Sequence, residues 1–470
     1  MTSNNISAKE RMAIDRQVMR EQEAAQRAGN FSEVNLGLTE QLALLEARRC
    51  LQCKEAKCIA GCPVLVNIPQ FINHLAEGNL PAAAQCLMAD NALPAVTGRV
   101  CPQETQCEEL CIRGLKGAPV AVGYLERYVA DWARTHLDEV LAPIEVKPSG
   151  KSVAVVGSGP AGLTAAGELV KFGHAVTIYE AFHTPGGVLV YGIPEFRLPK
   201  EIVRQEVERL ERAGVKIECN TIIGATWTLA ELREKFDAIF IANGAGLPVF
   251  MEVPGENLKG VYSANEYLTR VNLMAAYSFP EVDTPVLKGQ RVVVVGGGNV
   301  AMDSVRTAKR LGADSATIVY RRGKAELPAR AEEVHHAEEE GIAFDFLVAP
   351  VEVMGNETGW VSGLKCLRME LGEPDASGRR RPVPIAGSEY VIPCDIVVVA
   401  IGTRANPLLT NSTPDLKLNK WGNIIAEENG QTSIPGVYAG GDIVRGAATV
   451  ILAMGDGKSS AQAINEYLQG

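Results

Sequence analysis

The stretch KSVAVVGSGPAGLTAAGELVKFGHAVTIYEA, residues 151–181, decides the fold of this chain. It predicts a strand, a glycine-rich loop, a helix and a second strand. The loop matches G-x-G-x-x-G, in which glycines allow a tight turn and let the backbone approach a pyrophosphate at the helix N-terminus. Glu180 ends the second strand, where its carboxylate can accept hydrogen bonds from ribose hydroxyls. The loop residues predicted to bind the dinucleotide are Gly157, Gly159, Pro160, Ala161 and Gly162.

A second stretch, GQRVVVVGGGNVAMDSVRTAKRLGADSATIVYRR at residues 289–322, repeats this pattern. Its second strand ends in arginines rather than in an acid. An acid there would repel a 2′-phosphate, whereas arginine pairs with one through two parallel hydrogen bonds, so this unit favours NADP(H) over NAD(H). The alternative is that the arginines form a solvated surface pair. The residues predicted to bind NADP(H) are Gly296, Gly298, Asn299, Val300, Ala301, Arg321 and Arg322.

The C-terminal stretch TSIPGVYAGGDIVRGAATVILAMGDGKSSAQAINEYL, residues 432–468, indicates which dinucleotide the first loop binds. It predicts a strand ending at Gly441 and Asp442 and a long helix that begins near Ala447. Asp442 can bind a ribityl chain, and the helix N-terminus can stabilise the anionic reduced flavin. The stretch resembles the FAD-closing motif of pyridine-nucleotide-dependent flavoproteins, so the first site is predicted to bind FAD.

Apolar strands alternate with amphipathic helices after residue 150, which predicts an α/β protein with parallel sheets. The stretches DAIFIANGA and DIVVVAIGTRAN predict the two crossings between the dinucleotide units, with the NADP unit inserted in the FAD unit as in a glutathione-reductase-like fold. APIEVKPSG reads as a linker after a helical N-terminal domain. The predicted boundaries are 1–145 for the helical domain, 142–150 for the linker, 150–285 and 401–470 for the FAD unit, and 286–400 for the NADP unit.

Seven of the 11 cysteines lie in two short stretches, CLQCKEAKCIAGCP at 50–63 and RVCPQETQCEELC at 99–111. A disulfide scaffold would be short and secreted, whereas this chain is long and expected to be cytoplasmic, so the cysteines are predicted to bind metal. The first stretch is similar to the bacterial ferredoxin pattern, in which the fourth cysteine precedes proline and binds a different cluster. Structural zinc is the alternative, but zinc cannot carry the electrons of a flavin.

The remaining composition excludes several classes of function. A net charge of −10 argues against a broad nucleic-acid-binding surface. No apolar run is long enough to span a bilayer, and the polar N-terminus does not resemble a signal peptide, so a cytoplasmic location is expected. Disulfide reductases of this fold carry a cysteine pair near the flavin, but Cys219, Cys366 and Cys394 form no such motif. Electrons leaving the flavin must therefore go elsewhere.

The motifs together resemble the small subunit of NADPH-dependent glutamate synthase and the large subunit of NADH-dependent ferredoxin:NADP oxidoreductase, an electron-bifurcating enzyme. The resemblance covers residues 31–470. It rests on CLQCKEAKCIAGCPV, IPQFI, GRVCPQETQCEELC, PVAVGYLERYVAD, VVGSGPAGL, GGVLVYGIPEFRLPK, GGGNVAMD, YRR and YAGGD.

The resemblance implies two 4Fe–4S clusters with interleaved ligands. Glu126, in the LERY stretch, matches a family position held by Glu or Gln and would supply the eighth ligand. The flavin-side loop at residues 186–200 would bring Gly186 and Gly187 to FAD and Arg197 near flavin N5, unless Arg197 forms a structural ion pair. The implied ligands are Cys50, Cys53, Cys58 and Cys111 for one cluster, and Cys62, Cys101, Cys107 and Glu126 for the other.

The function expected from these observations is an FAD- and iron–sulfur-dependent NAD(P)H oxidoreductase subunit. It would convert the hydride of NADPH to single electrons for a partner. An electron-bifurcating complex is favoured, with a ferredoxin–NADP-reductase-like partner or with NADH-oxidising or hydrogenase-type subunits, and ferredoxin as a further partner. The alternatives are the small subunit of glutamate synthase, which needs its large subunit, and a non-catalytic assembly module.

A charged helix and the N-terminal segment carry two further expectations. His335 and His336 lie in a charged helix that reads as a solvated face or a partner surface. The first 30 residues are polar and predict a helix or arm that contacts a partner.

Overall fold

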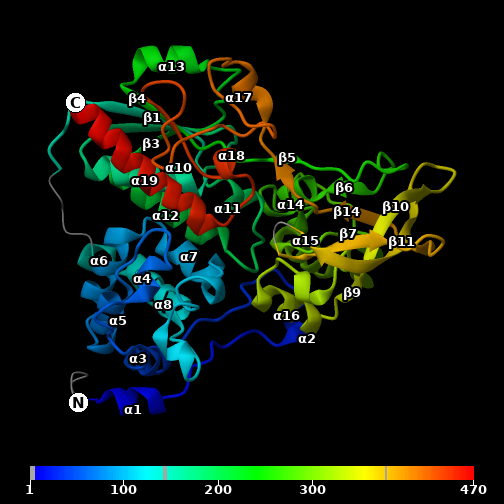
Figure 1. The fold of residues 1–470 in the computed structure, drawn as a ribbon, viewed down its shortest axis with the longest axis horizontal. Helices are drawn as coiled ribbons and strands as arrows, with labels where there is room; N and C mark the ends of the chain where they lie inside the picture. The colour runs from blue at the N-terminus through cyan, green and yellow to red at the C-terminus, as the bar shows by residue number, and fades with distance from the viewer. Residues whose placement is uncertain (1–5, 141–145, 376–377) are drawn as a thin grey trace.

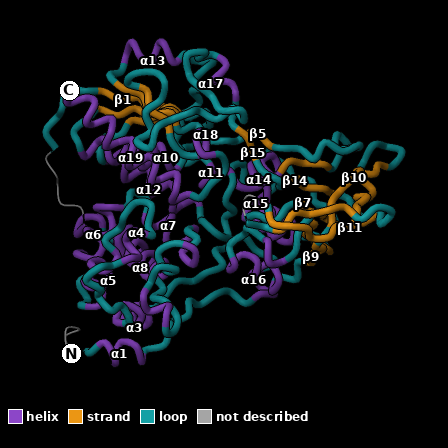
Figure 2. Tube along the Cα trace, in the orientation of Figure 1, coloured by secondary structure: helices purple, strands orange, loops and turns teal. Residues whose placement is uncertain are grey.

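The computed structural model describes residues 6–140, 146–375 and 378–470. Three parts lie side by side in Figure 1: a helical domain near the N-terminus and two units built on sheets. Figure 2 shows the strands gathered in the two sheet-containing units, while the first part is almost entirely helical. This arrangement confirms the predicted fold class. Part of the predicted linker, residues 141–145, lies outside the described residues.

The helical domain is built from short helices around a core of apolar residues that includes Phe71, Leu87 and Leu125. Three of its helices have a proline in the first turn, where the missing N–H costs no hydrogen bond. The loops between the helices carry the cysteines. The helices are α3 (Glu40–Arg48), α4 (Lys57–Ala60), α5 (Ile68–Ala76), α6 (Leu80–Asp90), α7 (Pro94–Val100), α8 (Val122–Thr135) and α9 (Leu137–Val140), with 3-10 turns at Gln103–Thr105 and Ile112–Leu115.

The first sheet is parallel, with strand order β16-β4-β1-β2-β3. Strand β16 comes from the C-terminal part of the chain, so the chain returns to this sheet after completing the second unit. The strands are β1 (Ser152–Val156), β2 (Ala175–Tyr179), β3 (Lys216–Glu218), β4 (Ala238–Ile241) and β16 (Val437–Ala439).

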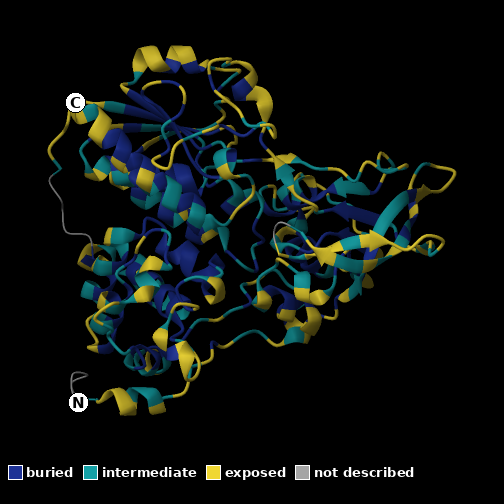
Figure 3. Ribbon diagram, in the orientation of Figure 1, coloured by how far each residue is buried: buried dark blue, intermediate teal, exposed yellow. Residues whose placement is uncertain are grey.

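Helices α10 and α19 pack against each other beside the first sheet, and Figure 3 shows their facing surfaces buried. A Cβ at Gly457 would lie 2.3 Å from the carbonyl oxygen of Ala161, so glycine there lets the two helices meet closely. The helices of this unit are α10 (Pro160–Lys171), α11 (Val188–Tyr191), α12 (Lys200–Arg212), α13 (Leu229–Lys235), α17 (Pro407–Asn411), α18 (Asp442–Arg445) and α19 (Val450–Gln469).

The second sheet is also parallel, with strand order β6-β14-β7-β8-β9. Its strand β6 lies upstream of the boundary expected at residue 286, because the sheet begins with the crossing segment. The elements of this unit are β6 (Val261–Ser263), α14 (Ala264–Asn272), β7 (Arg291–Val295), α15 (Asn299–Arg310), β8 (Ser315–Tyr320), α16 (Ala331–Glu339), β9 (Ala343–Phe346) and β14 (Ile396–Val399).

Two smaller sheets complete the fold. Strands β10 to β13 form an antiparallel sheet at the edge of the second unit, which the sequence motifs did not predict. Strands β5 and β15 pair antiparallel, so the two crossings between the units run side by side. The strands are β5 (Leu247–Pro248), β10 (Val348–Gly355), β11 (Val361–Pro374), β12 (Arg380–Pro384), β13 (Tyr390–Ile392) and β15 (Thr403–Arg404).

The N-terminal arm contacts its own chain. After α1 (Ala8–Ala13), it crosses to α16 of the second unit, forms α2 (Ala24–Arg27) and returns to the helical domain (Figure 1). Buried Arg27 pairs with Glu339 at 2.5 Å and with Glu340 at 3.1 Å. The arm is therefore a strap between the helical domain and the second unit.

Within the described ranges, no helix is long and apolar enough to cross a membrane.

Candidate functional site

The first glycine loop lies between β1 and α10, where the sequence predicted it. Gly157 has a φ of 100°, and a Cβ there would lie 2.6 Å from the carbonyl oxygen of Ala242. A Cβ at Gly162 would lie 2.0 Å from the carbonyl oxygen of Gly157. At Gly159, by contrast, a Cβ would meet nothing within 4 Å. The protein thus leaves open space at the N-terminus of α10, which fits the pyrophosphate of a dinucleotide.

Glu180 and the flavin-side loop are joined to this glycine loop through Ser158. Glu180 accepts hydrogen bonds from the Ser158 N–H at 2.9 Å and from the Ser158 hydroxyl. The same hydroxyl accepts the N–H of Gly186 at 2.9 Å. Gly187 has a φ of 56°, and a Cβ there would lie 2.8 Å from the Gly159 Cα. Sequence reasoning did not single out Ser158, whose role depends on the distant loop that it contacts.

Asp442 lies at the start of α18, after Gly441, whose φ is 75°. Its carboxylate accepts the N–H of Ala448 at 3.3 Å, and burial raises its pKa to about 6. Helix α19 begins at Val450 with Thr449 as its N-cap, a few residues beyond the expected start at Ala447. The difference arises because residues 446–449 form a loop that turns back onto Asp442.

The second glycine loop has the same construction. Gly296 has a φ of 145°, and a Cβ there would lie 2.3 Å from the carbonyl oxygen of Ala400. A Cβ at Gly298 would meet nothing within 4 Å, so the N-terminus of α15 is open to a phosphate. Ala301 is buried and Val300 is 43% exposed. The Asn299 side chain accepts the backbone N–H of Arg330 at 2.9 Å.

The arginines after β8 differ from each other. Arg321 is exposed. Arg322 is buried, forms an ion pair with Asp375 and donates to the carbonyl oxygen of Arg380 at 2.9 Å. Arg321 is therefore the arginine of this pair that solvent, or a nucleotide, can reach directly.

Arg197, which was predicted to lie near flavin N5, is held in a buried ion pair. Its side chain is 7% exposed and pairs with Asp303 at 2.8 Å and with Glu333 at 2.9 Å. Asp303 lies in α15 and Glu333 in α16, so the ion pair joins the flavin-side loop to the second unit. The ion pair named as the alternative is therefore present, and these two acids neutralise the buried guanidinium.

The prediction for His336 also needs correction. His335 is largely exposed, but His336 is only 2% exposed, and its Nε2 lies 3.1 Å from Glu21 of the strap. The charged sequence of α16 suggested a solvated face. The N-terminal strap instead covers part of that face.

The clustered cysteines lie near enough to one another to interact electrostatically, and Cys58 of one expected ligand set also acts on Cys107 of the other. Burial raises the pKa of Cys50 to about 11 and that of Cys58 to about 12, with further contributions from the nearby thiolates of Cys53 and Cys111. Burial also raises the pKa of Cys62, Cys101 and Cys107, and the negative charge of Glu126 contributes to all three shifts. We call the ligand sets that the resemblance implies group 1 (Cys50, Cys53, Cys58 and Cys111) and group 2 (Cys62, Cys101, Cys107 and Glu126).

Glu126 is buried on α8. Its carboxylate accepts hydrogen bonds from Asn91 at 2.9 Å and from Thr97 at 2.5 Å. Burial raises its pKa to about 7, although these hydrogen bonds oppose the shift. Both hydrogen bonds go to Oε1, which leaves Oε2 able to bind a metal. The donor set of group 2 therefore fits an iron–sulfur cluster with three thiolates and one carboxylate.

Zinc is the alternative occupant of these cysteines. Four thiolates around zinc lie about 3.8 Å apart, given Zn–S bonds of about 2.3 Å. In the described part of the chain, no set of three possible ligands that includes a cysteine lies within 4.8 Å.

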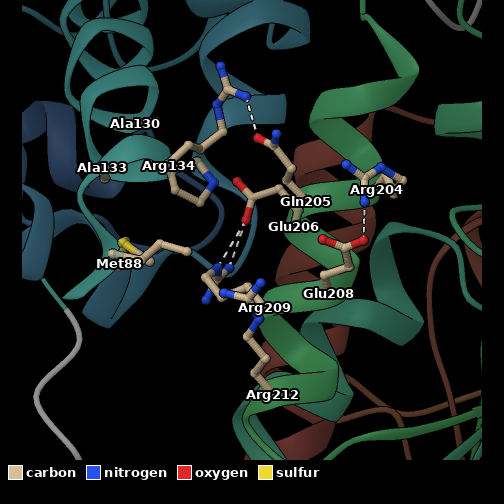
Figure 4. Close-up of a pocket in the computed structure, with 12 residues that line it drawn as sticks. Met88, Ala130, Ala133, Arg134, Arg204, Gln205, Glu206, Glu208, Arg209 and Arg212 are labelled. Atoms are coloured by element: carbon tan, nitrogen blue, oxygen red, sulfur yellow. Dashed lines mark hydrogen bonds and ion pairs between the residues drawn. The ribbon is translucent and has the colours of Figure 1, made fainter.

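A cavity of about 180 Å³ lies between α8 and α12. Figure 4 shows its polar residues paired with one another, including Arg134 with Gln205, Arg204 with Glu208 and Arg209 with Glu206. None of its lining residues belongs to a predicted cofactor loop.

Comparisons with known proteins agree with this geometry. Residues 27–137 match the family described as dihydropyrimidine dehydrogenase domain II, 4Fe-4S cluster, and residues 151–457 match pyridine nucleotide-disulphide oxidoreductase. The fold is similar to that of Mycobacterium tuberculosis FprA in complex with NADPH, with a TM-score of 0.57 and 24% identity over 69% of this chain and 85% of that one.

Two relatives are similar over most of the chain. The small chain of NADPH-dependent glutamate synthase from Azospirillum brasilense is 38% identical over 94% of this chain and 93% of its own length. The beta subunit of NADP(+)-dependent formate dehydrogenase from Moorella thermoacetica is 40% identical over 88% of this chain, which spans 60% of that subunit.

The fold and the site define an NAD(P)H-dependent oxidoreductase that uses flavin and iron–sulfur centres. Its dinucleotide loops bind FAD and NAD(P), and its helical domain is a 4Fe–4S domain. The chain belongs to the family that contains the small chain of NADPH-dependent glutamate synthase.

Proposed function

We propose that this chain takes electrons from NADPH at the second unit and passes them singly to a partner subunit through FAD and two 4Fe–4S clusters. The observation that carries the proposal is the difference in burial between the two implied ligand sets, since group 2 is fully buried and most of group 1 is partly exposed. When bound, FAD exchanges hydrides with the nicotinamide and single electrons with the clusters. The residues of the chain would bind the nucleotide, FAD and the clusters, hold them in sequence and keep water away from them.

Group 2 would lie on the flavin side. Pro63 follows Cys62 directly, and a Cβ at Gly455 of α19 would lie 3.0 Å from the Pro63 carbonyl oxygen. Lys458 of the same helix donates to the carbonyl oxygens of Val64 at 2.8 Å and of Asp90 at 2.9 Å. Since the start of α19 is predicted to face the flavin, these contacts support a short path from flavin to group 2.

Group 1 would lie on the partner side. Cys53, Cys58 and Cys111 are partly exposed, whereas all four ligands of group 2 are buried. Next to Cys111, the apolar side chains of Leu110, Ile112 and Leu115 are 42%, 54% and 82% exposed. Apolar side chains around a surface-exposed cluster suit a docking site for a redox partner.

Replacing Leu115 with glutamate should weaken electron transfer to the partner about tenfold or more, because a charge would be desolvated in the docked interface. Reduction of a small dye by NADPH should stay unchanged. The matched control is Val391→Glu, since Val391 is 46% exposed on the distant strand β13. Equal losses in both variants, measured with the purified partner, would contradict the proposed docking site.

Replacing Arg321 with glutamine should raise the KM for NADPH about 10- to 100-fold, because a charge-assisted pair with the 2′-phosphate is lost. The KM for NADH, which has no 2′-phosphate, should change less than about twofold. Steady-state dye reduction with both nucleotides measures this. If both KM values rose equally, Arg321 would have no role in choosing NADP(H).

Three assemblies fit this function. An electron-bifurcating complex is the one that PVAVGYLERYVAD and CIAGCPVLVNIP favour. The full-length likeness to glutamate synthase small chains supports a large amidotransferase subunit. The likeness to a formate dehydrogenase subunit supports a third, dehydrogenase-containing assembly. Anaerobic purification from the native source, with mass spectrometry of stoichiometric co-eluting subunits, would decide. A lone chain that lacks flavin and iron would contradict all three and support the non-catalytic assembly module.

A further inference from the structure

Arg330 of the second unit reaches into the cysteine loop of the helical domain. Its side chain is 8% exposed. Its guanidinium donates to the Arg99 carbonyl oxygen at 3.1 Å and to the Gln103 side-chain oxygen at 2.7 Å, and it lies 3.3 Å from the Glu104 carboxylate. Arg99 precedes Cys101 in the sequence, and Gln103 and Glu104 follow it. The positive charge of Arg330 is therefore held next to the loop that carries this group 2 ligand.

The backbone around Arg330 is attached to the nucleotide loop. The N–H of Arg330 donates to the Asn299 side chain at 2.9 Å, and the N–H of Ala329 donates to the Gly297 carbonyl oxygen at 3.2 Å. Asn299 is the first residue of α15. A short segment therefore connects the loop predicted to bind NADP(H) with the loop that carries Cys101.

Two carboxylates also pair with Arg330. Glu332 lies 2.8 Å away within its own unit, and Glu104 is a half-exposed partner in the helical domain. The guanidinium of Arg330 contacts the residues on either side of Cys101, so its charge favours negative charge on the nearby ligands of group 2.

We propose that Arg330 is a positioning residue that docks the nucleotide loop onto the helical domain and raises the reduction potential of the cluster bound by group 2. The proposal rests on the assignment of group 2 as a cluster site. Reduction adds one negative charge to a cluster, and a neighbouring cation stabilises the reduced form. The cation comes from the nucleotide unit, so the potential of the cluster depends on how that unit is docked.

The test is an EPR-monitored redox titration of the holoprotein and of four variants. In Arg330→Gln the potential of the group 2 cluster should fall. At the wild-type midpoint potential, the ratio of reduced to oxidised group 2 cluster in Arg330→Gln should drop at least about threefold. Arg330→Lys should restore most of the loss because it keeps the charge. Glu104→Gln should raise the potential because it removes a negative charge from the same loop.

The matched control is Arg368→Gln, since Arg368 is an exposed arginine that pairs with Asp345 and lies in strand β11, outside the helical domain that holds groups 1 and 2. In this variant the reduction potential of the group 2 cluster should equal that of the wild type. An unchanged potential in both Arg330→Gln and Glu104→Gln, with both cluster signals present, would overturn the proposal even if Arg330→Gln were less stable. If the wild type lacked a second cluster signal, the assignment of group 2 itself would be wrong, and the proposal would fall with it.

Discussion

Replacing Cys107 with serine should lower the iron content from about eight to about four atoms per chain and abolish electron transfer to the partner. The reason is that Cys107 is a buried thiol that would supply one of the four ligands of group 2. Dye reduction by NADPH should survive within about twofold, because a dye accepts electrons directly from the flavin. Iron analysis and EPR of the anaerobically purified variant measure the loss.

Two further variants make this result specific. Cys58→Ser should remove the other cluster and leave the group 2 signal. Cys86→Ser is the matched control, because Cys86 is a partly buried cysteine of the same domain that belongs to neither group. A full iron content in both Cys107→Ser and Cys58→Ser would contradict the assignment of the two groups.

Replacing Gly159 with alanine should yield a folded protein that retains less than about one-tenth of its FAD. A Cβ at Gly159 meets no protein atom within 4 Å, so the fold should tolerate it. The added methyl would instead occupy the space where the backbone approaches the pyrophosphate. Circular dichroism and the absorbance ratio of flavin to protein measure the two parts of this expectation.

Gly298→Ala provides the matched comparison in the second loop, where a Cβ is equally free of protein contacts. It should keep full FAD and lose binding of NADP(H). Loss of flavin from both variants would show a general folding defect, and full flavin in Gly159→Ala would contradict the assigned pyrophosphate site.

The features that the sequence predicted correctly depend on local backbone geometry. The positive φ angles at Gly157 and Gly296 follow from tight turns that only a few neighbouring residues determine. The same is true of the strand-to-helix connections around them. Such patterns can be read from a few consecutive residues, and the structure has both loops where they were expected.

The features that were missed depend on residues far apart in the chain. Arg197 is neutralised by Asp303, 106 residues away, and His336 is covered by Glu21, 315 residues away. Strand β6 (Val261–Ser263) joins a sheet whose next strand along the chain, β7, starts only at Arg291. No local spacing indicates these contacts, because they form only when the units and the strap pack together.

The most direct test of the proposed electron path is an anaerobic reductive titration with dithionite, followed by absorbance and EPR. The proposed function predicts uptake of about four electrons per chain, two by FAD and one by each of two 4Fe–4S clusters, with two distinct EPR signals. Uptake of only about two electrons, with zinc in place of iron, would contradict it.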